Sequence, residues 1–304
     1  MLLAIMTDFV DFYLVELRRE DFKLLRKTKM PFGYATAFYQ TEKGIIFVLC
    51  LERCLVNLNQ AWSSNPTAKI HSGICSPLNN STYNVTDNSQ SEDGPFSMAR
   101  YSRPYDIASL NGFADEKLYV TDFSRIRLID QQTQEITTVY QTSGEGDLNR
   151  FGRIGVNFYE EDILYLGGSE SIIKLELQNY TEIRNFPCKG CEIVIPLSSS
   201  VIVAAKTYDF VLEDGISVLI DTDTKEISDI SAMLKSDSFP YGEEQHIGHI
   251  NFINYDGMLY VSVFSDSSAV LISMKINSKY QLFIHSLILK SCLNILVVVT
   301  TPHV

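Results

Sequence analysis

The sequence predicts an all-β fold, and three observations support this prediction. Short apolar strands alternate with tight polar turns along most of the 304 residues. Residues that favour strands are common, with 17 Phe and 16 Tyr against a single Trp. The stretch 94–147 shows one complete unit, whose predicted strands are 105–110, 118–120, 125–129 and 135–140. Units of this kind, about 40 to 45 residues long and repeated around an axis, are typical of a β-propeller.

Composition sets the size of the domain and argues against one class of partner. With 45% hydrophobic residues the chain can bury a large core, and we expect residues 1–304 to form a single propeller domain. The net charge of −12 argues against nucleic-acid binding, which depends on clustered Lys and Arg. Only one basic segment is dense, and it contains Arg18, Arg19, Lys23, Arg26, Lys27 and Lys29.

The N-terminal region predicts a pair of outer strands. Residues 1–10 are apolar but lack a basic segment, so they make a poor signal peptide. The stretches 12–17 and 22–25 are predicted as two strands joined by a polar turn, with a charge-rich helix as the alternative. The same layout at 172–177 and 182–186 favours the strands.

Further copies of the unit follow along the chain. Residues 30–36 and 46–48 repeat the pattern of 103–109 and 118–120, which makes them the first full copy. Other apolar strand cores occur at 164–166, 201–203 and 259–261. The polar stretch at about 62–92 shows little periodicity and is predicted to be an exposed insertion loop, with a degenerate blade as the alternative.

The C-terminal region predicts how the fold closes. Residues 293–300 resemble an inner strand, and nothing after them completes a blade. Pairing this strand with the N-terminal outer strands would give a six-bladed ring without free sheet edges. A membrane span at 282–299 is the alternative, but Lys290 near its middle would be costly in lipid, so buried strands are favoured.

The best-preserved unit resembles a known repeat family. The runs DGPFSMARYSRPYDIAS, EKLYVTDFSRIRLID and EITTVYQTSGEG are similar to the progression of the NHL repeat. Asp106 stands where that family usually has Gly, and the copies at 164–166, 201–203 and 259–261 lack an equivalent of Asp122. The resemblance implies a six-bladed propeller. Most NHL propellers are interaction platforms, and related rings include calcium-dependent lactonases and a zinc lyase.

Acidic residues after the predicted inner strands suggest a ligand site at one mouth of the central channel. We expect Asp122, Glu170, Asp209 and Asp266 there, together with Tyr105 on an entering loop. Such carboxylates could hold calcium or a basic partner segment. The alternative is that they are solvated turn residues, because Asp, Ser and Gly favour turns and most turn carboxylates have no other role.

A second candidate site lies in the stretch GEEQHIGH at 242–249. His246 and His249 are separated by two residues and lie beside two carboxylates, so they could contribute to a zinc or other transition-metal site. The alternative is a polar loop between blades with one half-buried His.

The six cysteines allow disulfides but do not require them. Cys188 and Cys191 are predicted to form a local disulfide across a turn, since no second C-x-x-C or redox fold accompanies them. Cys54 could reach Cys75 across the predicted insertion. Buried free thiols are the alternative if the compartment is reducing.

Glycosylation sequons favour an extracellular or secretory location despite the poor signal peptide. Four N-x-S/T matches begin at Asn79, Asn80, Asn84 and Asn179. Asn80 and Asn84 fall in the predicted insertion loop, and Asn179 falls in an outer-strand turn, so a glycan would fit at each.

Two classes of function remain. The favoured one is a monomeric, non-catalytic scaffold that binds a protein or carbohydrate partner, by analogy of fold. The alternative is a calcium- or zinc-dependent hydrolase or lyase in which the bound metal activates water.

Overall fold

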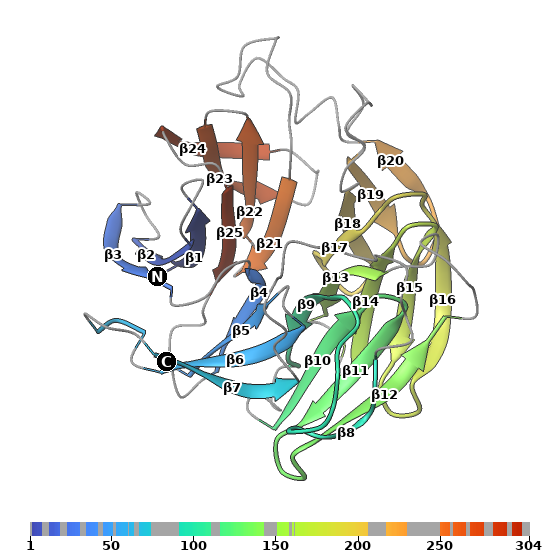
Figure 1. Cartoon of the computed structure of the whole chain (residues 1–304). Coiled ribbons are helices and arrows are strands. Elements are labelled where there is room, and N and C mark those ends of the chain that lie inside the picture. Colours follow the sequence, from blue (N-terminus) through green and yellow to red (C-terminus); the bar gives the residue numbers. More distant parts are fainter. Residues whose placement is uncertain are drawn as a thin grey trace.

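The computed structural model describes most of the chain. It covers residues 2–7, 12–18, 23–30, 35–41, 45–50, 53–59, 61–63, 67–73, 91–110, 116–142, 151–157, 160, 162–205, 217–229, 250–255, 258–265, 268–276, 282–290 and 294–299. Side chains are described between residues 13 and 228. Throughout these residues the regular elements are strands (Figure 1).

The described strands form six antiparallel sheets. We number them in chain order beginning with the sheet that contains β4, so that the sheet containing both β1 and β25 is sheet 6. Sheet 1 contains β4 (Ala35–Gln40), β5 (Ile46–Cys50), β6 (Cys54–Asn59) and β7 (Thr67–Gly73). Sheet 2 contains β9 (Pro104–Ala108), β10 (Lys117–Asp122), β11 (Arg125–Asp130), β12 (Glu135–Gln141) and, outermost, β8 (Gly94–Pro95). Sheet 3 contains β13 (Phe151–Val156), β14 (Ile163–Gly168), β15 (Ser171–Glu176) and β16 (Thr181–Pro187).

The other three sheets complete the arrangement. Sheet 4 contains β17 (Ile193–Pro196), β18 (Val201–Ala205), β19 (Ser217–Asp221) and β20 (Ile227–Asp229). Sheet 5 contains β21 (Ile250–Tyr255), β22 (Met258–Ser265), β23 (Ser268–Ile276) and β24 (Leu282–Lys290). Sheet 6 contains β25 (Asn294–Val299), β1 (Leu2–Thr7), β2 (Phe12–Leu17) and β3 (Leu24–Lys29).

The first strand of each sheet lies next to the first strand of the following sheet. Contacts join β4 to β9, β9 to β13, β13 to β17, β17 to β21, β21 to β25, and β25 to β4. Figure 1 shows these strands toward the middle of the molecule, with β3, β7, β16 and β20 at its outside. This is a propeller-like arrangement of small sheets.

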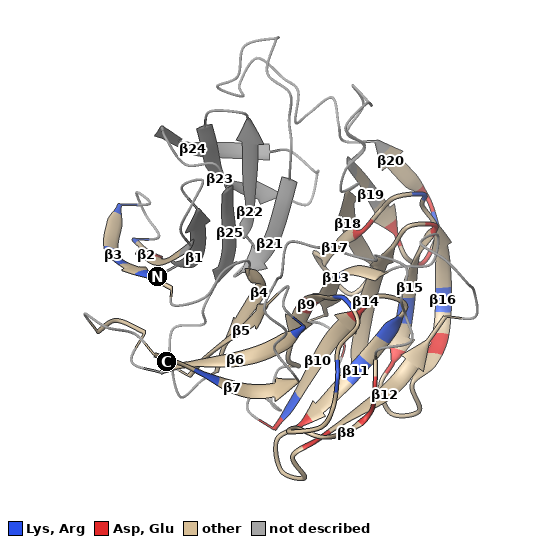
Figure 2. Ribbon diagram, in the orientation of Figure 1, with Lys and Arg blue, Asp and Glu red and all other residues tan. Residues whose placement is uncertain are grey.

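Hydrophobic cores lie between neighbouring sheets. Leu49 and Leu55 of sheet 1 pack with Leu118 and Val120 of sheet 2, and all four are fully buried. Because the middle strands are covered on both faces, they read as continuous apolar runs. The outer strands carry more charge, as Figure 2 shows on β16, whereas β5 and β6 contain no Lys, Arg, Asp or Glu.

Most of the predicted strand cores are confirmed. The predicted strands 118–120, 125–129 and 135–140 correspond to β10, β11 and β12, and 12–17 corresponds to β2 rather than to a helix. The stretch 282–299 contains strands β24 and β25. In the part of the chain that the structure describes, no helix has the length and apolarity needed to cross a membrane.

β7 and β1 are among the strands that the sequence does not predict. Residues 67–73 form β7 inside the stretch interpreted as an exposed loop, and Ser72 and Gly73 at its end are buried. The prediction of a loop across all of 62–92 is therefore wrong for β7. Residues 2–7 form β1, although the sequence analysis assigned them no strand.

Sheet 6 combines strands from both ends of the sequence. β25 pairs with β1 in a register that places Leu296 opposite Ile5, and β1 pairs in turn with β2. The sequence predicted the inner strand and the outer pair of this sheet, but not β1, which lies between them.

The surroundings of His71 predict that acid weakens the contact between sheets 1 and 2. Its ring lies between Phe47 and Phe96, with centroid distances of 4.7 and 4.8 Å. Burial lowers the pKa of His71 below its usual 6.5, the charge of Lys69 acts in the same direction, and the amide of Gln131 opposes it. In acid the unfolded chain therefore binds a proton at His71 more readily than the folded chain does. The contribution of neutral His71 to the free energy of unfolding is complete above pH 6.5 and is lost as the pH falls below it.

We therefore expect stability to urea to fall between pH 7.5 and pH 5.5 more steeply in the wild type than in a His71→Gln variant, which cannot be protonated. Urea midpoints measured across this range test the prediction. Equal slopes for the two proteins would assign the pH dependence to other groups.

Candidate functional site

Asp122, predicted to be a ligand-binding carboxylate, is instead enclosed by protein donors. Its side chain lies at the end of β10 and has no exposed surface. One carboxylate oxygen accepts hydrogen bonds from the amides of Ser102 (2.9 Å) and Arg103 (2.7 Å). The other accepts from the Ser91 hydroxyl (2.7 Å) and the Arg127 guanidinium (3.0 Å). The prediction for Asp122 is corrected, because its oxygens are used inside the fold.

Arg127 extends this buried network. Its guanidinium is fully buried, donates to the carbonyl oxygens of Arg100 (3.0 Å) and Glu92 (2.8 Å), and pairs with Asp93 (3.0 Å). Asp93 also accepts hydrogen bonds from the amide and hydroxyl of Thr138 on β12, both at 2.9 Å. We call Asp93, Asp122 and Arg127 the Arg127 triad, in which Arg127 and Asp122 are buried and Asp93 is exposed. Its hydrogen bonds and ion pairs hold residues 91–103 against sheet 2.

A different polar group lies where the first strands meet. Arg153 on β13 pairs with Asp106 on β9 at 3.1 Å, and the same nitrogen lies 3.4 Å from the carbonyl oxygen of Thr36 on β4. The Arg153 guanidinium also lies 5.4 Å from the centre of the Tyr105 ring. Because one side chain reaches the first strands of two preceding sheets, this group lies on the axial side of the sheets. We call Thr36, Tyr105, Asp106 and Arg153 the axial cluster.

The charged side chains of the axial cluster are partly exposed, and the pKa of Asp106 depends on its neighbours. The side chains of Arg153 and Asp106 are 18% and 13% exposed. Burial raises the pKa of Asp106, while the Arg153 guanidinium and the amide of Ile154 (2.8 Å) oppose that rise. An aromatic face, a guanidinium and a carboxylate together suit recognition of a polar or charged group.

The structure describes two of the remaining predicted site residues. Glu170 is exposed in the turn between β14 and β15, and Tyr105 belongs to the axial cluster. Asp209, Asp266, His246 and His249 lie outside the described residues. Within the described part of the chain, no three or more His, Cys, Asp or Glu side chains are grouped so that they could hold a metal ion.

Sequence reasoning missed three members of the axial cluster, Thr36, Asp106 and Arg153. The sequence signal for Asp106 is that it stands where the NHL pattern usually has Gly, but this difference alone does not indicate a site residue. Its carboxylate bonds to Arg153 and Ile154 across the gap between sheets 2 and 3. Arg153 follows Phe151 and Gly152 with no feature that distinguishes it from a surface arginine.

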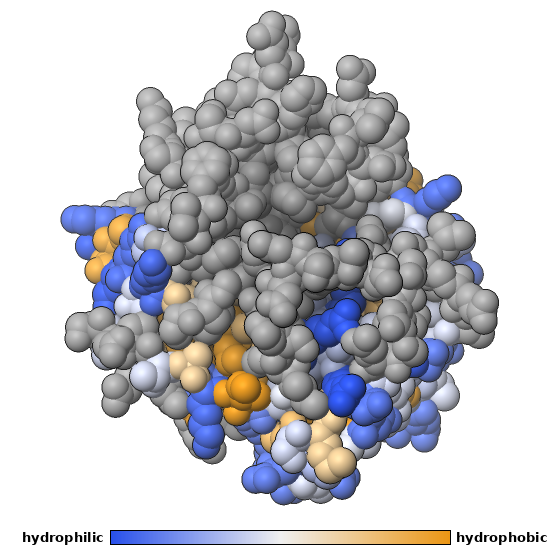
Figure 3. All heavy atoms as spheres, viewed as in Figure 1, coloured by the Kyte–Doolittle hydropathy of each residue, from blue (hydrophilic) through white to orange (hydrophobic). Residues whose placement is uncertain are grey.

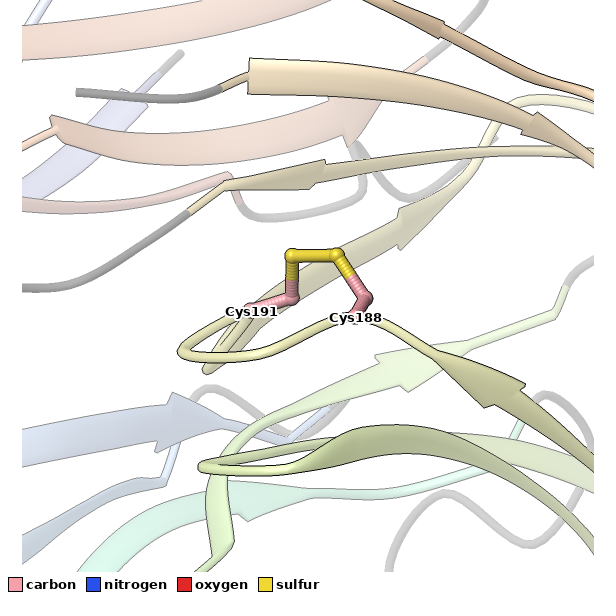
Figure 4. Close-up of a disulfide and its surroundings, with 2 residues drawn as sticks. All are labelled: Cys188 and Cys191. Carbon is pink, nitrogen blue, oxygen red and sulfur yellow. A yellow bond between two sulfur atoms is a disulfide. The ribbon is translucent and has the colours of Figure 1, made fainter. Parts of the chain in front are cut away.

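The predicted disulfide between Cys188 and Cys191 is confirmed (Figure 4). Cys54 is also disulfide-bonded, while its predicted partner Cys75 lies outside the described residues. Asn179 is exposed in the turn between β15 and β16. Asn80 and Asn84 lie outside the described residues.

Comparisons with known proteins support the class of fold. No protein-family model matches the chain, and no curated protein matches it. A chain from a nidogen/laminin complex is similar in structure, with a TM-score of 0.57, 11% identity and 97% of each chain covered. Dihydro-heme d1 dehydrogenase NirN in complex with DHE gives a TM-score of 0.51 and 11% identity over 97% of this chain and 74% of that one.

A functionally unknown protein from Desulfotomaculum acetoxidans DSM 771 is similar to the same degree. Its TM-score is 0.51 and its identity 9%, over 93% of this chain and 79% of that one. At such low identities the likeness concerns the fold alone. Together with the six small antiparallel sheets of the described residues, it defines an all-β protein of propeller type.

Proposed function

We propose that this chain is a non-catalytic, NHL-like interaction scaffold that binds a protein or carbohydrate partner through the axial cluster. The observation that carries the proposal is the position of Arg153, which joins three sheets while its guanidinium stays partly exposed beside Tyr105. A ring of sheets can present such a group rigidly, so that little conformational freedom is lost on binding.

The proposal treats the six sheets as six blades of a closed ring. Pairing of β25 with β1, and the contact of β25 with β4, support this closure. The likeness to a chain from a nidogen/laminin complex supports a role in protein binding, although only by analogy of fold.

The proposed setting is extracellular or in the secretory pathway, with the protein acting as a glycosylated monomer. The disulfide at Cys188 and Cys191, the disulfide-bonded Cys54 and the exposed sequon at Asn179 support it. Both Asn179 and Thr181, the two residues that a glycosyltransferase must reach, are exposed.

We expect Asn179 to carry a glycan when the chain is expressed through a eukaryotic secretory pathway. Asn179→Gln and Thr181→Ala should each lower the mass by one glycan, whereas Thr181→Ser should keep it because serine completes the sequon. Mass spectrometry after deglycosylation in heavy-oxygen water reads out the modified Asn. An unmodified Asn179 in the wild type would contradict this expectation.

Site-specific photocrosslinking tests the binding function. A photoreactive amino acid replaces Tyr105 in one protein and Ile183, exposed on the outer strand β16, in a matched control. After exposure to material from the secreting tissue, we expect adducts at position 105 that excess unlabelled protein competes away, and few at position 183. Equal labelling at both positions, or none at 105, would overturn the proposal.

Metal analysis tests the non-catalytic part. Stoichiometric calcium or zinc in purified protein, lost on His249→Ala and accompanied by hydrolysis of a lactone or ester, would replace the scaffold with the metal-dependent alternative. We expect the purified protein to turn over no such substrate.

A further inference from the structure

The disulfide turn at Cys188 and Cys191 is attached to the neighbouring hairpin of sheet 3. It connects β16 to β17, and the amide of Gly190 donates to the carbonyl oxygen of Ser169 at 2.6 Å. The amide of Cys188 donates to the carbonyl oxygen of Glu170 at 3.4 Å. Gly190 has φ +77°, a conformation that other residues rarely adopt, so the shape of the turn is specific.

The residue after the disulfide is packed directly against β13. The carbonyl oxygen of Glu192 accepts a hydrogen bond from the amide of Arg153 at 2.6 Å. A Cβ atom added to Gly152 or Gly167 would overlap the main chain of Glu192, so the two backbones are in close contact. A shift of Glu192 therefore has to move Arg153 or break its amide hydrogen bond.

This packing links the disulfide to the axial cluster. Arg153 receives the constraint at its amide and carries the guanidinium that pairs with Asp106. Cys191 is joined to Glu192 by a peptide bond, and Glu192 is joined to Arg153 by a backbone hydrogen bond.

We propose that the pair Cys188 and Cys191 is a redox switch that controls the axial cluster. The inference rests on the proposed function, because it assigns a form of regulation to the same site. With the disulfide intact, Glu192 holds β13 and Arg153 in the binding geometry. With the pair reduced, the turn relaxes, Glu192 withdraws from Arg153, and the partner binds less tightly.

Accessibility sets the chemistry of the switch. Cys188 is partly exposed and Cys191 is fully buried, so a dithiol reductant attacks the sulfur of Cys188. The disulfide breaks, Cys191 leaves as a thiolate and takes a proton, and a mixed disulfide forms at Cys188. The second thiol of the reductant then attacks the reductant's other sulfur, which is bonded to Cys188 in the mixed disulfide, and Cys188 is released as a thiol. The protein gains two electrons and two protons, and the reductant becomes a cyclic disulfide.

Amide hydrogen exchange tests the coupling. The wild type is compared with a Cys188→Ser/Cys191→Ser double variant under non-reducing conditions, which leaves the disulfide at Cys54 intact. We expect exchange at the Arg153 and Gly190 amides to accelerate roughly tenfold in the variant. The amide of Leu128 in sheet 2 is the internal reference and should not change. Wild-type protein treated with dithiothreitol, which can also reduce the disulfide at Cys54, should show acceleration at the same two amides.

Two results would overturn the switch. Unchanged exchange at Arg153 would show that the disulfide does not constrain β13. Equal acceleration at Arg153 and Leu128 would show that the disulfide only stabilises the whole fold.

A second readout separates this inference from the proposed function. Photocrosslinking from position 105 should give fewer adducts in the double variant than in the wild type. Adducts of equal yield in the two proteins would overturn the switch alone. Local acceleration at Arg153 with no specific adduct in either protein would keep the coupling and overturn the scaffold function.

Discussion

Removing residues 1–29 is expected to abolish cooperative folding of the whole chain. The deletion takes away β1, β2 and β3, which are three of the four strands of sheet 6, and leaves β25 without its partner. It also removes the fully buried side chains of Leu14, Val15 and Leu17. Each contributes about 1.5–3 kcal/mol by burial, so their loss alone approaches the roughly 5–15 kcal/mol that stabilises a typical domain.

Calorimetry of the truncated chain measures this effect, and a cross-link tests its cause. Ile5 and Leu296 face each other in the register of β1 and β25, so Ile5→Cys with Leu296→Cys should form a disulfide and raise the melting temperature. Ile5→Cys with Val297→Cys is the matched control, because a shift of one residue places the two side chains on opposite faces. A truncated chain that melts at the wild-type temperature would show that sheet 6 is not needed.

Replacing Arg127 with methionine is expected to destabilise the protein by about 3–5 kcal/mol. The substitution keeps an unbranched stem but leaves the buried carboxylate of Asp122 without its cation, and Asp93 loses the same partner. The carbonyl oxygens of Glu92 and Arg100 each lose one of two donors and keep the backbone amide of the other residue. Urea unfolding followed by circular dichroism measures the change.

Arg125→Met provides the control, two residues earlier on the same strand. The Arg125 side chain is partly exposed and donates long hydrogen bonds to Gln141 and to the carbonyl oxygen of Ser91, both at 3.4 Å, so its loss should cost less than about 1 kcal/mol. Combining Arg127→Met with Asp122→Asn should cost less than the sum of the two single changes, because the residues share one network. Equal effects of Arg127→Met and Arg125→Met would refute a central role for the Arg127 triad.

The middle strands could be predicted from sequence because neighbouring sheets cover both of their faces. β10 and β14 are buried along almost their whole length, and this produces the apolar cores at 118–120 and 164–166. Outer strands give a weaker signal. β7 has four exposed residues in succession before its buried end, which leaves no alternation to recognise. β1 was considered only as a signal peptide, so its pairing with β25 was missed.

The site was harder to predict because its contacts join distant parts of the chain. Asp122 follows its strand as a ligand carboxylate would, and it is buried only because residues 91–103 fold over it. Asp106 and Arg153 are 47 residues apart and meet through the packing of β9 against β13. Neither spacing nor composition fixes which side chains face each other across two sheets.

The mixed origin of sheet 6 has a consequence for synthesis on the ribosome. β1 to β3 are made first, but β25 emerges more than 260 residues later, which at about 5–20 residues per second takes roughly 15 to 60 seconds. During that interval β1 has no inner neighbour, and these three strands are available to chaperones. They are thus expected to reach their final structure only after β25 has been made.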